Sequence, residues 1–526
     1  MIKLNIHRKF KMFTAAIASI CILTVSLQSC VDLEEDPTEI RLAPGAYSSI
    51  FELDLGVNGI YAQLRNASMW STFYVNGWSG DDMTTHKTSN KADFREFDQR
   101  SVSNANGRTV QNWNNIYGMI AAANNVLKNI EGITLEDAEA QQRLLGEVYF
   151  LRGAMFFHLA RVHGRIALPT TPEIDYDIKL SSEIEVYEQI ESDLNQAVAF
   201  LPVIYPGVED GAPRPNKGSA KSLLARLYMD WAGFPVKDNT KYAKAQTTAK
   251  EVIDNSASHG FELESNLENL WTMENRFNKE STWTIAYCQP CGTQNGKFAC
   301  LGMPGDLQGW GETFAEIRYF EDFPEGARKE ATYRTDLDWT NFNDQVTPVF
   351  KKIVGPDLDV PLGVFFTSRN DFYMRYAEVL LIYAEASGEA GNVTAEAWEA
   401  LNQIRRRAAG LPYATPVLTP TSQLDAEGNA LPALPQYVDV SSGDISELTF
   451  QERKLELAGE WIRWNDLVRK EKVAEVLGNR DPQVTPDNQN GGIIDVQNPI
   501  IGSLGTENYF APIPAAQIKL LPGLGE

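Results

Sequence analysis

A mainly α-helical protein, built from paired helices with a large irregular loop-rich region, is the fold that this sequence predicts. Three observations support the prediction. Apolar side chains recur every three or four residues over long stretches, small residues are spaced along several of these stretches, and long segments rich in Gly, Asn, Asp and Pro interrupt them. With 526 residues, 43% of them hydrophobic, the chain has ample material for a globular core.

Five segments have the apolar period of a helix. Trp113, Ile116 and Ile120 share one face of the first, and Gly164 and Pro202 follow the second and third, where a helix commonly ends. The predicted helices cover 106–130, 137–163, 183–200, 216–232 and 240–254.

Two distant segments share a pattern of helix pairs. A helix that includes Ala220 is followed, across a polar turn, by the alanine-rich 242–245, and a helix that includes Ala377 is followed by further alanines over 395–400. Small residues at helical spacing let two helices approach closely, as in tetratricopeptide hairpins of about 34 residues. Neither copy has the full consensus, so we expect degenerate helix pairs stacked into a curved scaffold.

The helical period fades over 256–370, 410–444 and 478–510. Long irregular stretches inside a compact protein are usually functional or packed tightly against the scaffold. Because helices come from both halves of the chain, we expect one domain over 45–526, in which an N-terminal half of about 45–255 interlocks with a C-terminal half of about 256–526.

The N-terminus has the order of a secretory signal peptide. Residues 1–29 carry four cations and no acid, and their apolar run over 12–27 is shorter than the roughly 20 residues that a membrane-spanning helix needs. Leu27-Gln28-Ser29-Cys30 resembles the lipobox of bacterial lipoproteins, whose cysteine is acylated, for example with palmitate, after the preceding peptide is removed. We therefore predict a signal peptide over 1–29 and lipidation at Cys30. The alternative is an exported protein in which Cys30 is incidental.

An acidic tether extends over 30–44 and begins at Cys30. It resembles the signal that exports lipoproteins of Bacteroidetes to the outer face of the outer membrane, and this predicts a lipid-anchored protein that faces the cell exterior. The formal charge of the chain is −23, and it becomes about −27 when the four leader cations are removed. Nucleic acid is excluded as a partner, because phosphate binding needs a cationic surface.

Three further cysteines lie in the body of the chain, at Cys288, Cys291 and Cys300. The spacing of Cys288 and Cys291 suits a redox motif, but no thioredoxin-like order of strands and helices surrounds it. A zinc site would need a fourth ligand, which the sequence does not nominate. We favour a local disulfide in an oxidising compartment, which leaves one thiol free.

Segments from all parts of the chain resemble the SusD/RagB family. Their order along this chain is the order in which the corresponding motifs occur in the family. The segments are 146–154, 164–169, 186–202, 371–386, 401–408, 452–469 and 511–514. The resemblance implies four tetratricopeptide-like helix pairs and an irregular region that holds the ligand. It implies a noncatalytic surface lipoprotein, without a cofactor, that binds a nutrient, usually a glycan, and delivers it to a SusC-like TonB-dependent transporter for polysaccharide utilisation.

Charged residues within these segments have a structural explanation. They lie in helices rich in core residues, so we predict that they pair as buried charges where helices meet, and do not bind the ligand. They are Arg152, Glu378, Arg405, Glu452 and Arg463.

A neutral sugar has flat apolar faces and hydroxyls, so its site needs exposed aromatic platforms beside amides and carboxylates. Eleven tryptophans are candidates. Trp271 and Trp283 lie in a segment that resembles a structural family motif. On predicted helices, and so assigned to the core, are Trp113, Trp231, Trp398, Trp461 and Trp464. The remaining candidates are Trp70, Trp78, Trp310 and Trp339.

The loop over 70–82 combines three aromatic platforms with polar side chains between glycines. Its candidate ligand residues are Trp70, Tyr74, Asn76, Trp78, Asp81 and Asp82. The alternative is a loop packed on the scaffold, in which the two aspartates cap a turn or helix. Trp310 is a second candidate, because the glycines on either side let its ring stand free of the backbone. We hypothesise that Trp78 and Trp310 line one glycan site.

The sequence does not support catalysis or a metal site. It has no G-x-S-x-G or H-E-x-x-H motif, and the mature chain's histidines, His86, His158, His163 and His259, lack metal-ligand spacing. We expect His158, on an apolar helix, to be a hydrogen-bonded core residue. With 70 acidic residues, a carboxylate pair of the glycosidase kind could be nominated almost anywhere. Two alternatives stay open: a helical carbohydrate-active hydrolase and a tetratricopeptide-type protein-binding scaffold.

Overall fold

The computed structural model describes residues 47–86, 90–207, 213–297, 309–335, 347–356, 366–480 and 498–526, and two short strands between 484 and 495. These residues belong to one compact unit, Tyr47–Glu526. Cys30, Cys300 and Trp339 lie outside the described residues.

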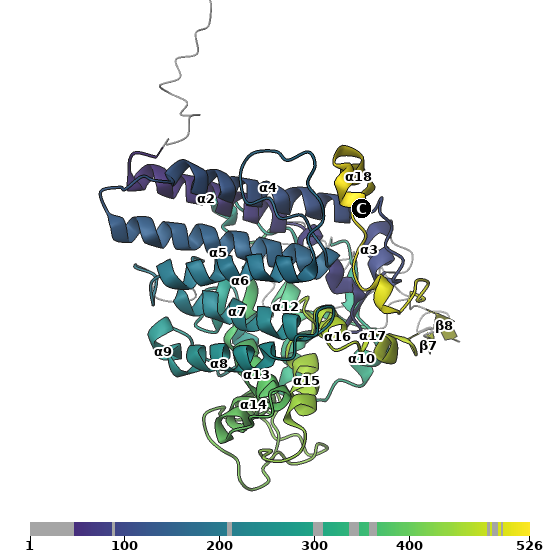
Figure 1. Ribbon diagram of the computed structural model, residues 1–526. Coiled ribbons are helices and arrows are strands. Elements are labelled where there is room, and N and C mark those ends of the chain that lie inside the picture. Colours follow the sequence, from purple (N-terminus) through teal and green to yellow (C-terminus); the bar gives the residue numbers. More distant parts are fainter. Residues whose placement is uncertain are drawn as a thin grey trace, which may run out of the picture. The chain divides into compact units, whose positions relative to one another are not determined.

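Long helices stack one on another in chain order, and the predicted mainly helical fold is confirmed (Figure 1). Each of the first six packs on the next, and α8 packs on α13, which contacts α14 and α15. The long helices are α2 (Ile50–Ser68), α4 (Gly107–Ile130), α5 (Ala138–His163), α6 (Glu183–Phe200), α7 (Lys217–Ala232), α8 (Lys241–Asp254), α13 (Tyr376–Glu389), α14 (Ala395–Ala408) and α15 (Ile445–Glu456).

The five predicted helices of the N-terminal half are confirmed to within one residue at each end, and local capping explains the accuracy. Ser182 and Asn216 form capping boxes at the starts of α6 and α7, so that side chains satisfy backbone N–H groups that a helix leaves open. Gly164 ends α5 with a φ of 70°, a conformation that residues with a side chain rarely adopt.

Both predicted helix pairs are confirmed, and they join the two halves of the chain. The pairs are α7 with α8 and α13 with α14, and their small residues Ala245, Ala249 and Ala397 are fully buried. The two pairs meet through α8 and α13, where Gln246 Nε2 donates to Ser387 Oγ at 3.0 Å. One apolar cluster therefore runs from α2 through α14.

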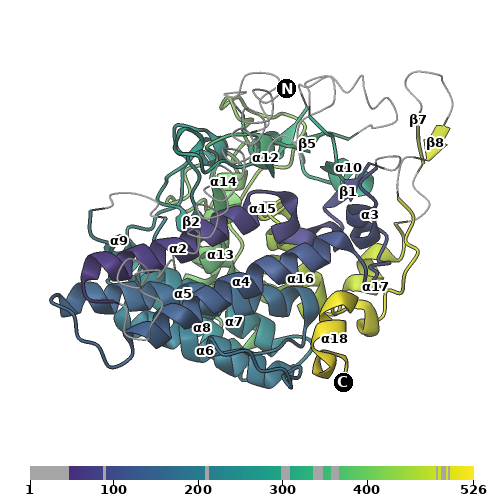
Figure 2. The same ribbon diagram turned by 90° about the horizontal axis from the view of Figure 1, so that it is seen from above.

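The irregular region between the helix pairs contains short elements. All described sheets are antiparallel and two-stranded. The pairs are β1 (Met83–Thr85) with β3 (Thr313–Ala315), β2 (Ser281–Ile285) with β6 (Asp371–Arg375), β4 (Tyr333–Arg334) with β5 (Val349–Phe350), and β7 (Val484–Pro486) with β8 (Ile493–Asp495). In Figure 2, α10, α12 and β5 lie on one side of the stack and α4, α5 and α6 on the other.

Short helices complete the described part of the chain. The α-helical ones are α3 (Ala92–Asp98), α9 (Ser256–His259), α10 (Ile317–Glu321), α11 (Ala327–Thr332), α12 (Lys351–Val354), α16 (Arg463–Arg469), α17 (Val473–Leu477) and α18 (Ala515–Leu520). The 3₁₀ helices are η1 (Ser71–Ser79), η2 (Leu267–Trp271), η3 (Gln289–Cys291), η6 (Thr506–Asn508) and η7 (Pro522–Gly525).

Four of the five predicted buried charges are confirmed, at Arg152, Glu378, Glu452 and Arg463. Arg152 on α5 donates to both carboxylate oxygens of Asp193 on α6, at 2.9 and 2.7 Å. Glu378 accepts from Arg226 and Arg453. For Arg405 the prediction of burial is wrong, because its side chain is 27% exposed, and its Nε lies 3.9 Å from Glu452.

Candidate ligand-binding site

The structure corrects the sequence prediction for two residues of the loop after α2. Trp78 is fully buried: its Nε1 donates to Thr313 Oγ1 at 3.1 Å, and its ring stacks on Phe94 at 4.3 Å. Asn76 is also buried, and its amide donates to the Arg161 carbonyl at 3.1 Å. The expectation that Trp78 is an exposed platform is wrong, because this part of the loop is packed into the core.

Asp81 and Asp82 also have structural partners. Asp81 Oδ1 accepts from Arg463 Nε at 2.6 Å, and Asp82 Oδ2 accepts from the Gly459 N–H at 2.9 Å. Burial raises the pKa of Asp82 to about 7. These contacts fix the loop to Gly459, in the turn after α15, and to Arg463, the first residue of α16.

Trp70 and Trp310, from distant parts of the chain, form a stacked pair. Their ring centroids lie 6.0 Å apart with an interplanar angle of 6°, and Trp310 is 38% exposed. Phe366 contacts the Trp70 ring edge-on. A Cβ at Gly296 would lie 2.9 Å from the Trp70 ring, so the absence of a side chain there is what lets this ring lie close to the backbone.

A small cavity of ≈ 70 Å³ lies near Trp70, although neither Trp70 nor Trp310 lines it. The Gly296 N–H donates to the Met69 carbonyl at 2.9 Å, and the residues on either side, Asn295 and Lys297, line the cavity. The cavity therefore adjoins the start of η1. Other lining residues are Tyr74, Leu270, Trp271, Thr272, Arg276, Lys352, Ile353, Arg369, Asn370, Asp371, Phe372, Gly459, Glu460 and Trp461.

Two stacked aromatic rings form part of the cavity wall. Tyr74 and Trp461 have centroids 5.5 Å apart and an interplanar angle of 6°. The assignment of Trp461 to a helix is wrong: it lies in the turn between α15 and α16, has a φ of 66° and is partly exposed. A Cβ at Gly77 would come within 2.6 Å of its ring. Gly459, two residues earlier, is the local signal that could have marked Trp461, as the flanking glycines marked Trp310.

Charged side chains form the polar part of the wall. Lys297 Nζ lies 2.5 Å from Asp371 Oδ2, and Lys352 Nζ lies 2.7 Å from Glu460 Oε1. Burial raises the pKa of Asp371, although Lys297 opposes the shift. Burial likewise lowers the pKa of Lys352, although Glu460 opposes that shift. No sequence motif marked these residues, because segments far apart in the chain bring them together.

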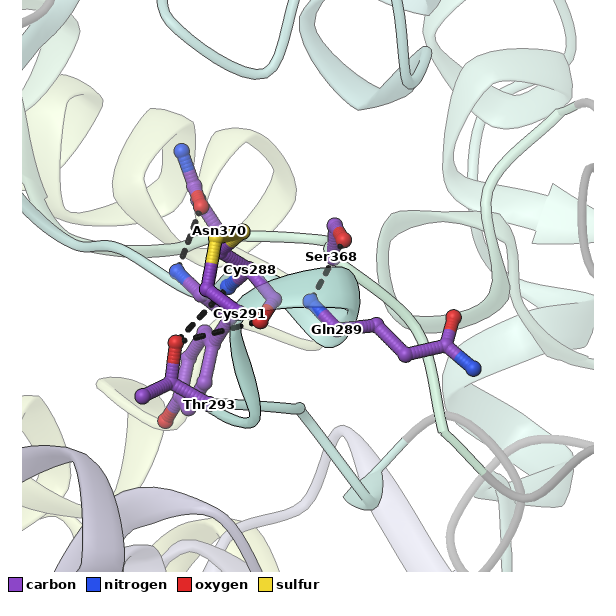
Figure 3. Close-up of a disulfide and its surroundings, with 7 residues drawn as sticks. Cys288, Gln289, Cys291, Thr293, Ser368 and Asn370 are labelled. Atoms are coloured by element: carbon purple, nitrogen blue, oxygen red, sulfur yellow. Dashed lines mark hydrogen bonds between the residues drawn. A yellow bond between two sulfur atoms is a disulfide. The ribbon is translucent and has the colours of Figure 1, made fainter.

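The predicted disulfide between Cys288 and Cys291 is confirmed, with a Cα–Cα distance of 5.2 Å (Figure 3). Its loop is held next to the cavity, since the Gln289 N–H donates to Ser368 Oγ at 2.9 Å and the Tyr287 N–H donates to Asn370 Oδ1 at 3.0 Å. Because Cys300 lies outside the described residues, the free thiol stays a prediction.

Three histidines, His158, His163 and His259, have backbone partners. Nε2 of His158 lies 2.6 Å from the Phe73 carbonyl, which confirms it as a hydrogen-bonded core residue, and Nδ1 of His163 lies 3.0 Å from the Ala511 carbonyl. Burial lowers the pKa of His158 and of His163 to about 4. Within the described ranges, no cluster of three or more His, Cys, Asp or Glu side chains is placed to hold a metal ion.

Two family models match the chain. One, described as "SusD family", covers residues 363–526, and the other, described as "Starch-binding associating with outer membrane", covers residues 43–229. Together they span about two thirds of the chain. No helix in the described part of the chain has the length and apolar character needed to cross a membrane.

Relatives match along almost the whole chain. SusD-like protein P2 of Formosa agariphila is 26% identical over 89% of this chain and 92% of its own length. A SusD homolog from Bacteroides thetaiotaomicron has a similar fold, with a TM-score of 0.73, 23% identity, and coverage of 91% of this chain and 96% of that one.

Two further solved structures share the fold, and their names include a ligand class. One is a laminarin binding SusD-like protein, with a TM-score of 0.66, 23% identity, and coverage of 91% of this chain and 98% of that one. The other is the surface glycan-binding protein A from Bacteroides fluxus, with a TM-score of 0.70, 22% identity, and coverage of 90% and 97%.

Proposed function

We propose, from the premise that this chain belongs to the SusD/RagB family, that it binds a glycan at the cell surface and delivers it to a SusC-like TonB-dependent outer-membrane transporter. The description of one matching family model, which names starch binding, supports the ligand class. The names of two solved structures with this fold support it too, since they describe laminarin binding and surface glycan binding. The transporter and the delivery step rest on the family resemblance.

The Trp70–Trp310 pair is the observation that best supports glycan binding by this chain. Sugar rings present apolar C–H faces, which stack on aromatic rings. Trp310 is 38% exposed, and Lys91 Nζ lies 4.7 Å from the centroid of its ring. The nearby cavity supplies polar groups, which can fix the orientation of a bound ligand. In this proposal Trp70 and Trp310 form the platform, and Tyr74 and Trp461 line the cavity near it.

Anchoring at Cys30 is the second part of the proposal. Its support is the lipobox sequence and the acidic tether that follows it. Anchored by lipid at the outer membrane, the protein would hold its ligand close to the transporter that takes it up. Cys30 itself lies outside the described residues.

Alanine substitution of the platform tests the site. In Trp70→Ala and Trp310→Ala we expect roughly tenfold weaker glycan binding each, because loss of a stacked aromatic costs about 1–2 kcal/mol. Calorimetric titration with a glycan panel measures the affinity, and thermal unfolding verifies that each variant is folded.

A matched control is Tyr176→Ala, since Tyr176 is an aromatic residue 70% exposed that does not line the cavity. It should bind as the unmodified protein does. Unchanged glycan affinity in folded Trp70→Ala and in folded Trp310→Ala would contradict the proposed glycan site.

Two measurements would favour the alternative functions, a carbohydrate-active hydrolase and a protein-binding scaffold. Release of new reducing ends during incubation would favour the hydrolase. Co-purification with the transporter, without affinity for any glycan, would favour the protein-binding scaffold.

A further inference from the structure

We propose that the glycan is acidic, and that the cavity near the Trp70–Trp310 pair holds one of its carboxylate or sulfate groups. This inference rests on the proposed function and names the substrate class of the same site. Three features of the cavity support it: its charge, its hydrogen-bonding capacity and its size.

Cations outnumber acids in the cavity wall. Two acids, Asp371 and Glu460, lie there, against four cations: Arg276, Lys297, Lys352 and Arg369. The whole chain has a formal charge of −23, so this wall has the opposite sign to the protein as a whole. A concave site whose lining has a net positive charge concentrates anions, whereas distant surface charges are screened beyond about 8 Å at physiological salt.

The acids of the wall already have several donors. Glu460 accepts from Lys352 and from Nε and Nη2 of Arg375, each at 2.7 Å. Asp371 pairs with Lys297 and accepts from the Asn295 amide at 3.2 Å. Neither carboxylate is therefore left as an open acceptor for a ligand.

In contrast, some hydrogen-bond donors of the cavity-lining residues have no partner. Among the described residues, Nε of Arg276 and Nε1 of Trp271 are buried and have no hydrogen-bond partner. Nη1 of Arg276 makes only a long contact, 3.4 Å, to the Met273 carbonyl. A sugar hydroxyl both donates and accepts, while a carboxylate or sulfate only accepts. A wall rich in donors and poor in open acceptors matches the second kind of group.

The size of the cavity fits one substituent of a sugar. Its ≈ 70 Å³ is well below the roughly 300–1,000 Å³ of pockets that enclose a whole small-molecule ligand. The chain of a glycan would lie on the exposed platform outside, with one acidic substituent directed into the cavity. A charge-assisted hydrogen bond from a guanidinium is about twice as strong as a neutral one, so this contact would contribute much of the selectivity.

Matched glycans test the charge preference. The probes are polygalacturonate, alginate, hyaluronan, carrageenan and chondroitin sulfate, each compared with its esterified or desulfated form, together with neutral laminarin and starch. We expect at least one acidic glycan to bind roughly tenfold or more tightly than its neutralised form. We expect that binding to weaken between about 50 and 500 mM NaCl.

Arg276 is the residue to vary, because its side chain is partly exposed and the contacts of its backbone do not depend on it. Arg276→Gln should lose roughly tenfold in affinity for the acidic glycan, and Arg276→Lys should keep most of it. Lys128→Gln is the control for net charge, since Lys128 is an exposed residue on α4 outside the cavity, and it should bind normally.

Each outcome decides between the two proposals. Equal binding of the acidic and neutralised forms, or binding of neutral glycans alone, would overturn the acidic-ligand inference and leave the proposed function intact. Unchanged affinity for an acidic glycan in folded Arg276→Gln would overturn the role of the cavity. If neither acidic nor neutral glycans bind, the proposed function fails and the inference fails with it.

Discussion

Asp82 is a fully buried carboxyl group whose ionisation is costly. Its Oδ2 accepts one backbone hydrogen bond from Gly459, while Oδ1 has no hydrogen-bond partner among the described residues. Burial raises its pKa from 3.8 to about 7, and neighbouring Asp81 adds to the shift. The folded protein therefore holds a proton on Asp82 at mildly acidic pH, where the unfolded chain has released it.

Stability should consequently fall as the pH rises through this interval. The contribution of protonated Asp82 is fully present below its unfolded pKa and is lost as the pH rises through about 7. Asp82→Asn removes the titration, so relative to this variant the unmodified protein should lose roughly 2–3 kcal/mol of unfolding free energy between pH 5 and pH 8.

Urea unfolding at both pH values measures the difference. Asp175→Asn, a change at an exposed aspartate, serves as the control and should show no such dependence. An equal stability difference between Asp82→Asn and the unmodified protein at both pH values would contradict the prediction.

At the scale of elements, buried ion pairs connect α7, α13, α15 and α16. Glu378 on α13 accepts from Arg226 of α7 at 3.0 Å and from Arg453 of α15 at 3.3 Å. Arg453 in turn donates to Asp466 on α16 at 2.9 Å. Although burial opposes the shift, the two guanidinium groups hold the pKa of Glu378 below its usual range.

Glu378→Gln should destabilise the fold by roughly 3–5 kcal/mol, because it leaves two buried guanidinium groups without their shared counter-charge. Glu251→Gln is the matched control: it removes the partner of Lys221 in an exposed pair and should cost at most about 0.5 kcal/mol. Urea denaturation of both variants makes the comparison. Similar, small losses of unfolding free energy in the two variants would show that the ion pairs of Glu378 do not stabilise the contacts of α13 with the neighbouring helices.

At the scale of the whole molecule, the proposed anchor and the ligand site are far apart in sequence. Cys30 precedes the compact unit Tyr47–Glu526, and every residue of the candidate site lies within that unit. The anchor should therefore determine where the protein is located, and have no influence on how tightly it binds. Stable anchoring takes more than one acyl chain, because a single chain holds a protein only marginally.

Cys30→Ala should abolish retention at the cell surface and leave glycan affinity unchanged in the purified protein. Protease accessibility on intact cells, together with membrane fractionation, measures retention, and calorimetry measures affinity. Cys30→Ala protein still held at the surface would argue against lipidation there. Loss of affinity in the purified variant would argue against independence of anchor and site.

Local sequence predicted the helices well and the site less well, for one physical reason. A helix is specified by its own apolar period and caps, so α4 to α8 could be delimited from the sequence. Exposure of a side chain depends on what packs over it. Trp78 and Trp310 looked alike as loop tryptophans, yet Thr313 and Phe94 enclose the first, while the second stays partly exposed.

The sequence by itself determined the helix pairs, the local disulfide and the family, because each is recorded in residues close together or in a fixed order along the chain. Only the tertiary structure decided the site. The packing of distant segments buries Trp78, stacks Trp70 on Trp310, and brings Arg276, Lys297, Lys352 and Arg369 around one cavity. Such a combination of aromatic rings and charge is set by long-range contacts, which no local pattern of residues encodes.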